Sequence, residues 1–143
     1  MDIRLARADE FSRVAAFYRE NGYTQDLAHE DIYVIAESGE SLCATLRLSR
    51  EQGFLILRGM RVIEARRRRG LGTRLLLAAR RPIGDEPCYC IPHRHLRSFY
   101  EQIGFREVEA QQAPGFLAER CERYRRDYGR DVILMHRAAV AME

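Results

Sequence analysis

Residues 62–73 read VIEARRRRGLGT, and the prediction of the fold works outward from this segment. A predicted strand ends here, a basic loop with two glycines follows, and helical spacing of leucines starts at Leu71. The first amides of a helix have no internal partner, and the helix dipole adds partial positive charge to them. Glycine lets a ligand approach the backbone, and arginines can pair with phosphate. The segment therefore predicts a phosphate-binding loop.

Two other kinds of phosphate loop fit less well. All 24 basic residues are arginine, so the lysine of a Gly-x-x-x-x-Gly-Lys-Ser/Thr loop is missing. A dinucleotide fingerprint would need a third glycine near Leu75, where none occurs. Taken alone, four consecutive arginines are more often a solvated charge run than a ligand site.

The first half of the chain reads as an antiparallel meander. Alternating and β-branched residues predict strands over 3–6, 32–37, 42–48 and 54–62. Asp9 is a plausible N-cap for a helix that ends near residues 21–22, and residues 23–30 read as a loop or a short helix. Gly59 lies inside a predicted strand, where glycine often marks a bulge or a close backbone approach.

The second half alternates between helices and strands. Helices are predicted over 70–80, 94–103 and 114–128, with strands over 87–91, 105–108 and 131–136. Pro114 opens the last helix and Gly129 closes it. We therefore predict an α/β (α+β) fold over residues 1–143: one domain, with a mixed central sheet, an antiparallel N-terminal meander and helices on both faces.

Two motifs together resemble a known family. Arg67-x-x-Gly70-x-Gly72, at a junction of strand, loop and helix, resembles the pyrophosphate loop of the GNAT superfamily of acyl-coenzyme A N-acyltransferases. Residues 96–105, LRSFYEQIGF, resemble its second signature, a helix reading Phe-Tyr-x-x-x-Gly-Phe. The order of the elements agrees with the family over residues 3–105. Residues 111–128 depart from it, because the family commonly joins its last two strands more directly.

The resemblance implies a site for acetyl-coenzyme A as co-substrate, with no metal. It implies that Tyr100 protonates the departing thiolate, although by itself Tyr100 reads as a core tyrosine on an apolar helix stripe. His93 stands where the family often has an Asn that contacts coenzyme A. The remaining cofactor-binding residues would act mainly through their backbone: Met60, Arg61 and Val62 for the pantetheine arm, and Arg67, Arg68, Arg69, Gly70, Leu71, Gly72 and Thr73 around the pyrophosphate.

The general base stays open at this stage. Family members often use a glutamate on one of the two strands flanking the site, but residues 54–62 and 87–91 contain no acid. Glu64, Glu30, His93 and water alone are the alternatives. The acceptor amine would enter beside the first helix and its loop, where Tyr18, Asn21 and Tyr23 are candidate lining residues.

The predicted function is direct transfer of an acetyl group to the amine of an unidentified small molecule or peptide. One alternative is a non-catalytic acyl-coenzyme A sensor. Another is a nucleic-acid-binding module that uses residues 66–69 and the arginines of 120–130, although acids such as Glu119, Glu122 and Asp127 interrupt that cluster. The net charge of +3 is mild, so no specific nucleic acid is expected as a partner. The sequence leaves open whether the protein forms a homodimer.

Cellular location and metal content follow from the same sequence. No apolar run approaches the roughly 20 residues that cross a bilayer, and residues 1–4 open without an apolar signal segment, so we expect a cytoplasmic protein away from membranes. The cysteines at 43, 88, 90 and 121 are scattered and lack the second ligand pair of a zinc site. Cys88 and Cys90 are expected to point to the same side of a strand.

Overall fold

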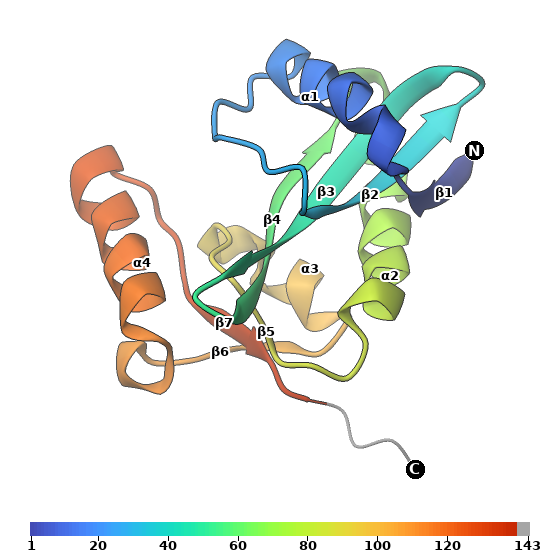
Figure 1. The fold of residues 1–143 in the computed structure, drawn as a ribbon. Helices are drawn as coiled ribbons and strands as arrows, with labels where there is room; N and C mark the ends of the chain where they lie inside the picture. The colour runs from blue at the N-terminus through green and yellow to red at the C-terminus, as the bar shows by residue number, and fades with distance from the viewer. Residues whose placement is uncertain (140–143) are drawn as a thin grey trace.

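A computed structural model describes residues 1–139, so residues 140–143, the end of the predicted domain, lie outside the described residues. The chain forms a seven-stranded sheet in the order β1-β2-β3-β4-β5-β7-β6, with helices packed on it (Figure 1). The strands are β1 (Asp2–Leu5), β2 (Ile32–Ser38), β3 (Ser41–Glu51), β4 (Phe54–Val62), β5 (Cys88–Cys90), β6 (Phe105–Glu107) and β7 (Met135–Arg137). The α-helices are α1 (Phe11–Glu20), α2 (Leu71–Ile83), α3 (Arg97–Glu101) and α4 (Gly115–Tyr128).

The pairing of the strands confirms the predicted mixed sheet. Strands β1 to β4 are antiparallel neighbours, β4 and β5 are parallel, and β7 lies antiparallel between β5 and β6. Tight turns at residues 39–40 and 52–53 join β2 to β3 and β3 to β4, as their glycines predict.

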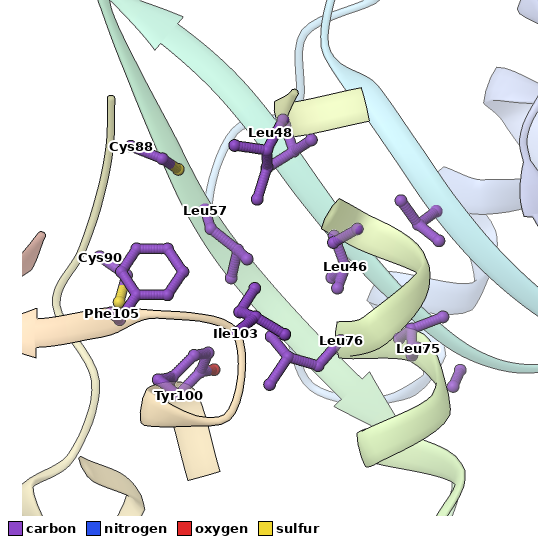
Figure 2. Packing of buried hydrophobic residues seen from close by; sticks show 14 of the residues in the cluster. Leu46, Leu48, Leu57, Leu75, Leu76, Cys88, Cys90, Tyr100, Ile103 and Phe105 are labelled. Atoms are coloured by element: carbon purple, nitrogen blue, oxygen red, sulfur yellow. The ribbon is translucent and has the colours of Figure 1, made fainter. Parts of the chain in front are cut away.

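One face of the sheet carries the main core. Helix α2 presents Leu75 and Leu76 to Leu46 and Leu57, while α3 adds Tyr100 (Figure 2). These leucines follow helical spacing on α2 and alternate positions on β3 and β4, so each element buries one apolar face. The side chains of Cys88 and Cys90 both join this core, as expected for residues two apart on a strand.

The opposite face is divided between two helices. Helix α1 packs against Tyr33 and Ile35 of β2, and α4 packs against Ile56 of β4 and Tyr89 of β5. Residues 21–31 form a loop on this face, and a buried ion pair fastens it to β3: Arg47 Nη2 lies 2.8 Å from Asp31 Oδ2.

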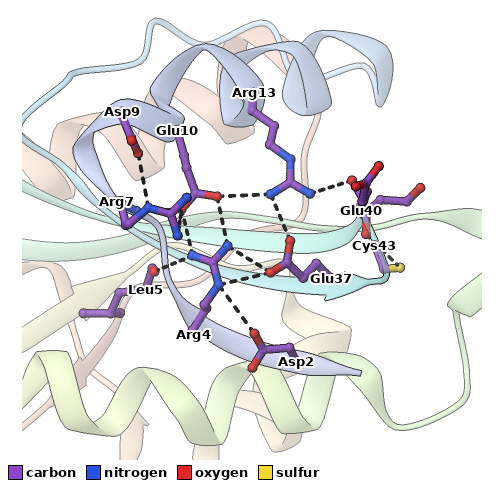
Figure 3. A network of polar contacts seen from close by, with 11 residues as sticks. Asp2, Arg4, Leu5, Arg7, Asp9, Glu10, Arg13, Glu37, Glu40 and Cys43 are labelled. Atoms are coloured by element: carbon purple, nitrogen blue, oxygen red, sulfur yellow. Dashed lines mark hydrogen bonds and ion pairs between the residues drawn. The ribbon is translucent and has the colours of Figure 1, made fainter.

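A polar network holds the start of α1 to the sheet (Figure 3). The carboxylate of Glu10 accepts hydrogen bonds from Arg4 and Arg13, and Glu37 of β2 pairs with the same two arginines. The prediction of Asp9 as N-cap is wrong. Asp9 lies in a 3₁₀ turn (Ala8–Glu10) and pairs with Arg7, while the buried Glu10 accepts the main-chain N–H of Arg7.

Element boundaries differ from the predicted ones at three places. Residues 94–103 form a 3₁₀ turn (Arg94–Leu96) followed by the short α3 rather than one helix. Helix α2 continues past residue 80 through Pro82 to Ile83, because a proline near the last turn sacrifices few internal hydrogen bonds. The last strand is shorter, and Val132 makes only an isolated bridge with His93. No helix within residues 1–139 has the length and apolar character needed to cross a membrane.

Candidate active site

A cleft of about 530 Å³ opens where β4 and β5 diverge. The two strands pair only at Leu55 with Cys88 and at Ile56 with Tyr89. From Leu57 onward, no strand of the described chain pairs with the β5 side of β4. Its walls come from β4, β5, the segments that follow β5, the loop after α1, the start of α2, and α4 with the residue after its cap. The lining residues are 22–25, 56–62, Gly72, 90–93, Leu96, Phe99, Tyr100, Arg120, Tyr124 and Arg130.

A β-bulge shapes the β4 wall of the cleft. Arg47 pairs with Arg58 and Thr45 pairs with Arg61, so Gly59 and Met60 together face one residue of β3. Gly59 has φ +69°, and a Cβ there would lie 3.1 Å from Tyr18 Oη and 3.2 Å from the Arg47 side chain. Only glycine fits this position comfortably, which confirms the bulge predicted from it.

The backbone of Met60, Arg61 and Val62 lies along the cleft, as the resemblance implies. Met60 and Val62 pack toward the main core, while the Arg61 guanidinium lies 5.0 Å from the centroid of the Tyr23 ring. Because no described strand pairs with the β5 side of β4 here, this edge can accept an extended arm as an added strand.

The predicted phosphate loop has a conformation that leaves its amides unpaired. Arg68 and Gly70 both have positive φ, +63° and +79°, and the Arg67 side chain donates from Nε to the Val62 carbonyl over 3.0 Å. Within residues 1–139, the amides from Arg68 to Thr73 donate no hydrogen bond. They precede and begin α2, a helix of 13 residues, so its dipole adds to their positive potential.

The loop residues contribute unequally to the cleft. Gly72 lines it, and a Cβ at Gly72 would lie 3.6 Å from the Phe99 ring. The remaining loop residues lie outside the lining: Arg67, Arg68, Arg69 and Gly70 are exposed, Leu71 is buried in the core, and Thr73 is partly buried. The loop therefore stands at the mouth of the cleft, with Gly72 innermost.

Tyr100 combines a core ring with a free hydroxyl. Its ring lies near Ile103 and Phe105, in edge contact with Phe105 at a centroid distance of 6.1 Å (Figure 2). The residue also lines the cleft, and its hydroxyl makes no hydrogen bond to any residue in 1–139. Burial raises the pKa of Tyr100, although the nearby Arg61 charge opposes the rise. A neutral phenol that faces a cleft can act as a proton donor.

Of the three side chains considered for the general base, His93 alone reaches this cleft. His93 lines it between β5 and α3, with its ring 5.8 Å from that of His95. Glu64 is exposed in a 3₁₀ turn (Glu64–Arg66), and Glu30 lines a separate polar hollow beside α4.

The acceptor side differs from the sequence prediction. Tyr23 lines the cleft as expected, but Tyr18 and Asn21 do not. Tyr18 is buried beneath the Gly59 bulge, and burial raises its pKa. Asn21 instead caps α1 by donating from its side-chain amide to the Phe17 carbonyl over 2.8 Å.

Helix α4 and the residue after its cap form a wall that sequence reasoning missed. Arg120, Tyr124 and Arg130 line the cleft, as Tyr23 does. The sequence signal was present as the arginine cluster 120–130, which was assigned to the nucleic-acid alternative. Arg120 is instead held to the sheet by Glu51, with Nη–Oε distances of 2.7 and 3.0 Å.

The described residues offer no metal cluster: no three His, Cys, Asp or Glu side chains in 1–139 gather as ligands. The four cysteines are all free and buried, and burial raises the pKa of Cys88 to about 12. Thiols with raised pKa are poor nucleophiles near neutral pH.

Comparisons with known proteins agree with this geometry. The family model for the acetyltransferase (GNAT) domain matches residues 28–107. The chain superimposes on Escherichia coli ElaA with TM-score 0.68 at 18% identity, covering 96% of this chain and 99% of that chain. It superimposes on Neisseria gonorrhoeae N-acetylglutamate synthase, complexed with coenzyme A and N-acetylglutamate, with TM-score 0.67 at 16% identity, covering 99% of this chain and 36% of that chain.

An aminoglycoside 6′-N-acetyltransferase complexed with coenzyme A has TM-score 0.65 at 16% identity, with coverage of 100% of this chain and 99% of that chain. No curated protein matches the chain by similarity. At these identities, the solved structures establish a shared fold.

Proposed function

Because the chain belongs to the GNAT acetyltransferase family, we propose that it transfers the acetyl group of acetyl-coenzyme A directly to the amine of a small molecule or peptide. The coenzyme A complexes of N-acetylglutamate synthase and of the aminoglycoside acetyltransferase support this choice of co-substrate. Acetyl-coenzyme A supplies an acetyl group already activated as a thioester.

The residues present fit that co-substrate. Unpaired amides from Arg68 to Thr73, at the start of α2, offer donors for a pyrophosphate. The edge of β4 at Met60, Arg61 and Val62 has no partner strand on its β5 side, so it offers main-chain groups for an amide-containing arm. The carbonyls of Met60 and Val62 accept hydrogen bonds from the side chains of Arg61 and Arg67, which such an arm would replace. His93, which also lines the cleft, offers a further polar contact.

Three groups would carry the chemistry. Main-chain N–H groups near Met60–Val62 stabilise the oxyanion that forms when an amine attacks the carbonyl carbon. Tyr100 Oη donates its proton to the departing sulfur. His93 or water takes the proton of the amine, which must be neutral to attack.

The single observation that carries the proposal is the position of Tyr100. Tyr100 lines the cleft that also contains the open β4 edge and Gly72, and its hydroxyl has no hydrogen-bond partner in residues 1–139. The hydroxyl of a buried core tyrosine ordinarily has a hydrogen-bond partner. A ligand that occupies the cleft would supply the missing partner.

A thiol-release assay with acetyl-coenzyme A and a broad panel of amines tests the function. We expect release that depends on the amine and saturates with it. Tight binding of acetyl-coenzyme A without release for any amine would instead indicate the acyl-coenzyme A sensor.

A further inference from the structure

We infer that the acceptor is a small amine that carries an anionic group, a carboxylate or a phosphate, and that Arg61 and Arg130 bind this group. The inference rests on the proposed function and specifies its acceptor class. It comes from the side chains that line the α4 end of the cleft: Tyr23, Arg58, Arg61, Arg120, Tyr124 and Arg130.

The bulge in β4 brings two of these arginines to one face of the sheet. In a regular strand, residues three apart point to opposite faces. The extra residue at Gly59 and Met60 shifts the alternation. Arg58 and Arg61, three apart on β4, therefore pair with Arg47 and Thr45, which are two apart on β3 and point to the same face. Both therefore lie on the face shared by the loop after α1 and by α4.

The ion pairs separate these arginines into two kinds. Arg58 and Arg120 share the carboxylate of Glu51, at 3.1 and 2.7 Å. Arg61 and Arg130 form no salt bridge within residues 1–139. Two guanidinium groups in the cleft therefore keep their charge available for a ligand.

Aromatic rings hold the two available guanidinium groups in place. Arg61 lies 5.0 Å from the ring centroid of Tyr23, and Arg130 lies 5.3 Å from that of Tyr124. A guanidinium that is stacked in this way loses less side-chain freedom on binding, and its planar fork suits carboxylate and phosphate oxygens. The site is therefore arranged for an anion before one arrives.

The cleft is also unsuited to polycationic amines. None of its lining residues in the described chain is Asp or Glu. Of the acids in the adjoining hollow, Glu51 and Asp31 are already paired with arginines, and Asp26 and Glu30 lie toward solvent. A second positive charge on the acceptor would therefore meet arginines without a carboxylate beside them.

The phosphates of acetyl-coenzyme A do not account for Arg61 and Arg130. The predicted phosphate loop leads into α2, which covers the main-core face of the sheet. Arg130 follows α4, which packs on the opposite face. A cleft of about 530 Å³ is of ordinary size for a small-molecule site, so a small acceptor suits the α4 end.

The experiment measures thiol release from acetyl-coenzyme A with matched amine pairs. The pairs are β-alanine with β-alaninamide, glycine with glycinamide, and phosphoethanolamine with ethanolamine, and spermidine serves as a polycation. We expect kcat/KM to be higher for the anionic member of at least one pair by about 10- to 100-fold, as for a charge-assisted hydrogen bond. The carboxylate and phosphate pairs distinguish the two kinds of anion.

Variants locate the selectivity. Arg61→Gln and Arg130→Gln should each reduce the ratio between anionic and neutral members, and the ratio cancels any effect of Arg61 on Tyr100. Arg126→Gln is the matched control on α4, because Arg126 is exposed, pairs with Asp127 and lies outside the cleft. It should leave the ratio unchanged.

A second measurement separates this inference from the proposed function. The same amines are added to the coenzyme A complex, and its melting temperature is followed. A shift with anionic amines that is lost in Arg61→Gln and Arg130→Gln supports the inference even if no thiol is released. Turnover that favours neutral amines or spermidine overturns the inference and leaves the function standing. The inference is also overturned if no anionic amine gives either turnover or a melting shift.

Discussion

At the scale of single residues, Tyr100 has two surroundings. Its ring makes edge contacts with Phe99 and Phe105. The residue also lines the cleft, and its hydroxyl has no hydrogen-bond partner in residues 1–139. The ring packs in the core, whereas the hydroxyl makes no hydrogen bond that would hold the fold. A substitution that removes only the hydroxyl therefore separates folding from chemistry.

Tyr100→Phe should leave the melting temperature nearly unchanged, because no hydrogen bond is broken within the described chain. Turnover should fall toward the low end of the roughly 10²–10⁴-fold range for general-acid removal, since a thiolate is already a fair leaving group. Melting, cofactor binding and turnover are measured on the same preparation.

Tyr33→Phe is the matched control. Tyr33 donates its hydroxyl to the Ala28 carbonyl over 2.8 Å and lies outside the cleft. The Tyr33→Phe variant should lose about 1 kcal/mol of stability and keep wild-type turnover. Wild-type turnover in Tyr100→Phe would assign Tyr100 to the core alone.

Substitution of Gly72 tests whether the predicted phosphate loop binds acetyl-coenzyme A. Its backbone angles suit any residue, and a Cβ would make ordinary contact with Phe99, so a side chain adds no backbone strain. Gly72→Asp should abolish most of the stabilisation by acetyl-coenzyme A, which is about 2.7 kcal/mol at 100 times the dissociation constant. Gly72→Asn adds the same volume without charge and should lose less. Equal ligand-induced melting shifts in the wild type and Gly72→Asp would show that acetyl-coenzyme A binds elsewhere.

The sequence motifs placed some candidate residues at the cleft, and other candidates lie elsewhere. Gly72 and Tyr100 were found because their motifs fix local geometry as well as identity. Tyr18 was misplaced because helical spacing puts it on a buried stripe without showing what packs over it. The Gly59 bulge covers Tyr18, and that contact joins segments far apart in the chain.

At the scale of elements, the bulge in β4 and the short pairing of β4 with β5 create the cleft. Gly59 alone indicated a bulge or a close backbone approach, because glycine inside a strand costs stability unless its conformation is used. The divergence from β5 could not be predicted, because it depends on which residues of two distant strands pair.

Gly59→Ala should destabilise the protein by more than the cost of a positive φ. That conformational cost is about 1–2 kcal/mol for a non-glycine residue, and crowding by Tyr18 and Arg47 adds to it. Gly39→Ala is the matched control, because Gly39 has φ +62° with nothing within 4 Å of an added Cβ. Chemical unfolding of both variants gives the difference. Equal losses would mean that the bulge tolerates a side chain.

Local sequence patterns predicted the bounds of helix α4 but not its position on the sheet. Its apolar spacing, Pro114 and Gly129 predicted its bounds well. Its position depends on Arg120 pairing with Glu51, which is 69 residues away, and on Leu117 and Cys121 packing over Ile56. Those contacts are long-range, so the sequence alone did not place α4 at the cleft.

At the scale of the whole molecule, the sheet has one fully covered face and one divided face. The network of Arg4, Glu10, Arg13 and Glu37 fixes α1 at one side of the divided face, and Glu51 with Arg120 fixes α4 at the other (Figures 1 and 3). The predicted alternation of helices and strands implied both layers. It did not imply that β7 inserts between β5 and β6.

Acid should weaken this arrangement. Hydrogen bonds from Arg4 hold the pKa of the Glu10 carboxyl far below its ordinary value of 4.5, and those from Arg13 and Arg4 lower the pKa of Glu37. A lowered folded-state pKa contributes stability that is present above the unfolded value and lost as pH falls through the folded one. The melting temperature should therefore decline progressively below about pH 4.5.

Glu10→Gln isolates the contribution of that carboxylate. At pH 7 it should melt about 5 °C below the wild type, as for lost charge-assisted hydrogen bonds, and the gap should narrow as the pH falls below 4.5. Glu20→Gln, at the other end of α1, is the control, because Glu20 is exposed and forms no salt bridge with residues 1–139. A gap between wild type and Glu10→Gln that stays constant with pH would refute the linkage.

The central claim is direct transfer of acetyl from coenzyme A to an amine in the cleft between β4 and β5. A single turnover with acetyl-coenzyme A that is radiolabelled in its acetyl group tests it most directly, with the best amine from the thiol-release panel. We predict that the label appears in the acetylated amine in step with free thiol, and that Tyr100→Phe slows both equally. Label that stays on coenzyme A, is released as acetate, or remains attached to the protein would contradict direct transfer.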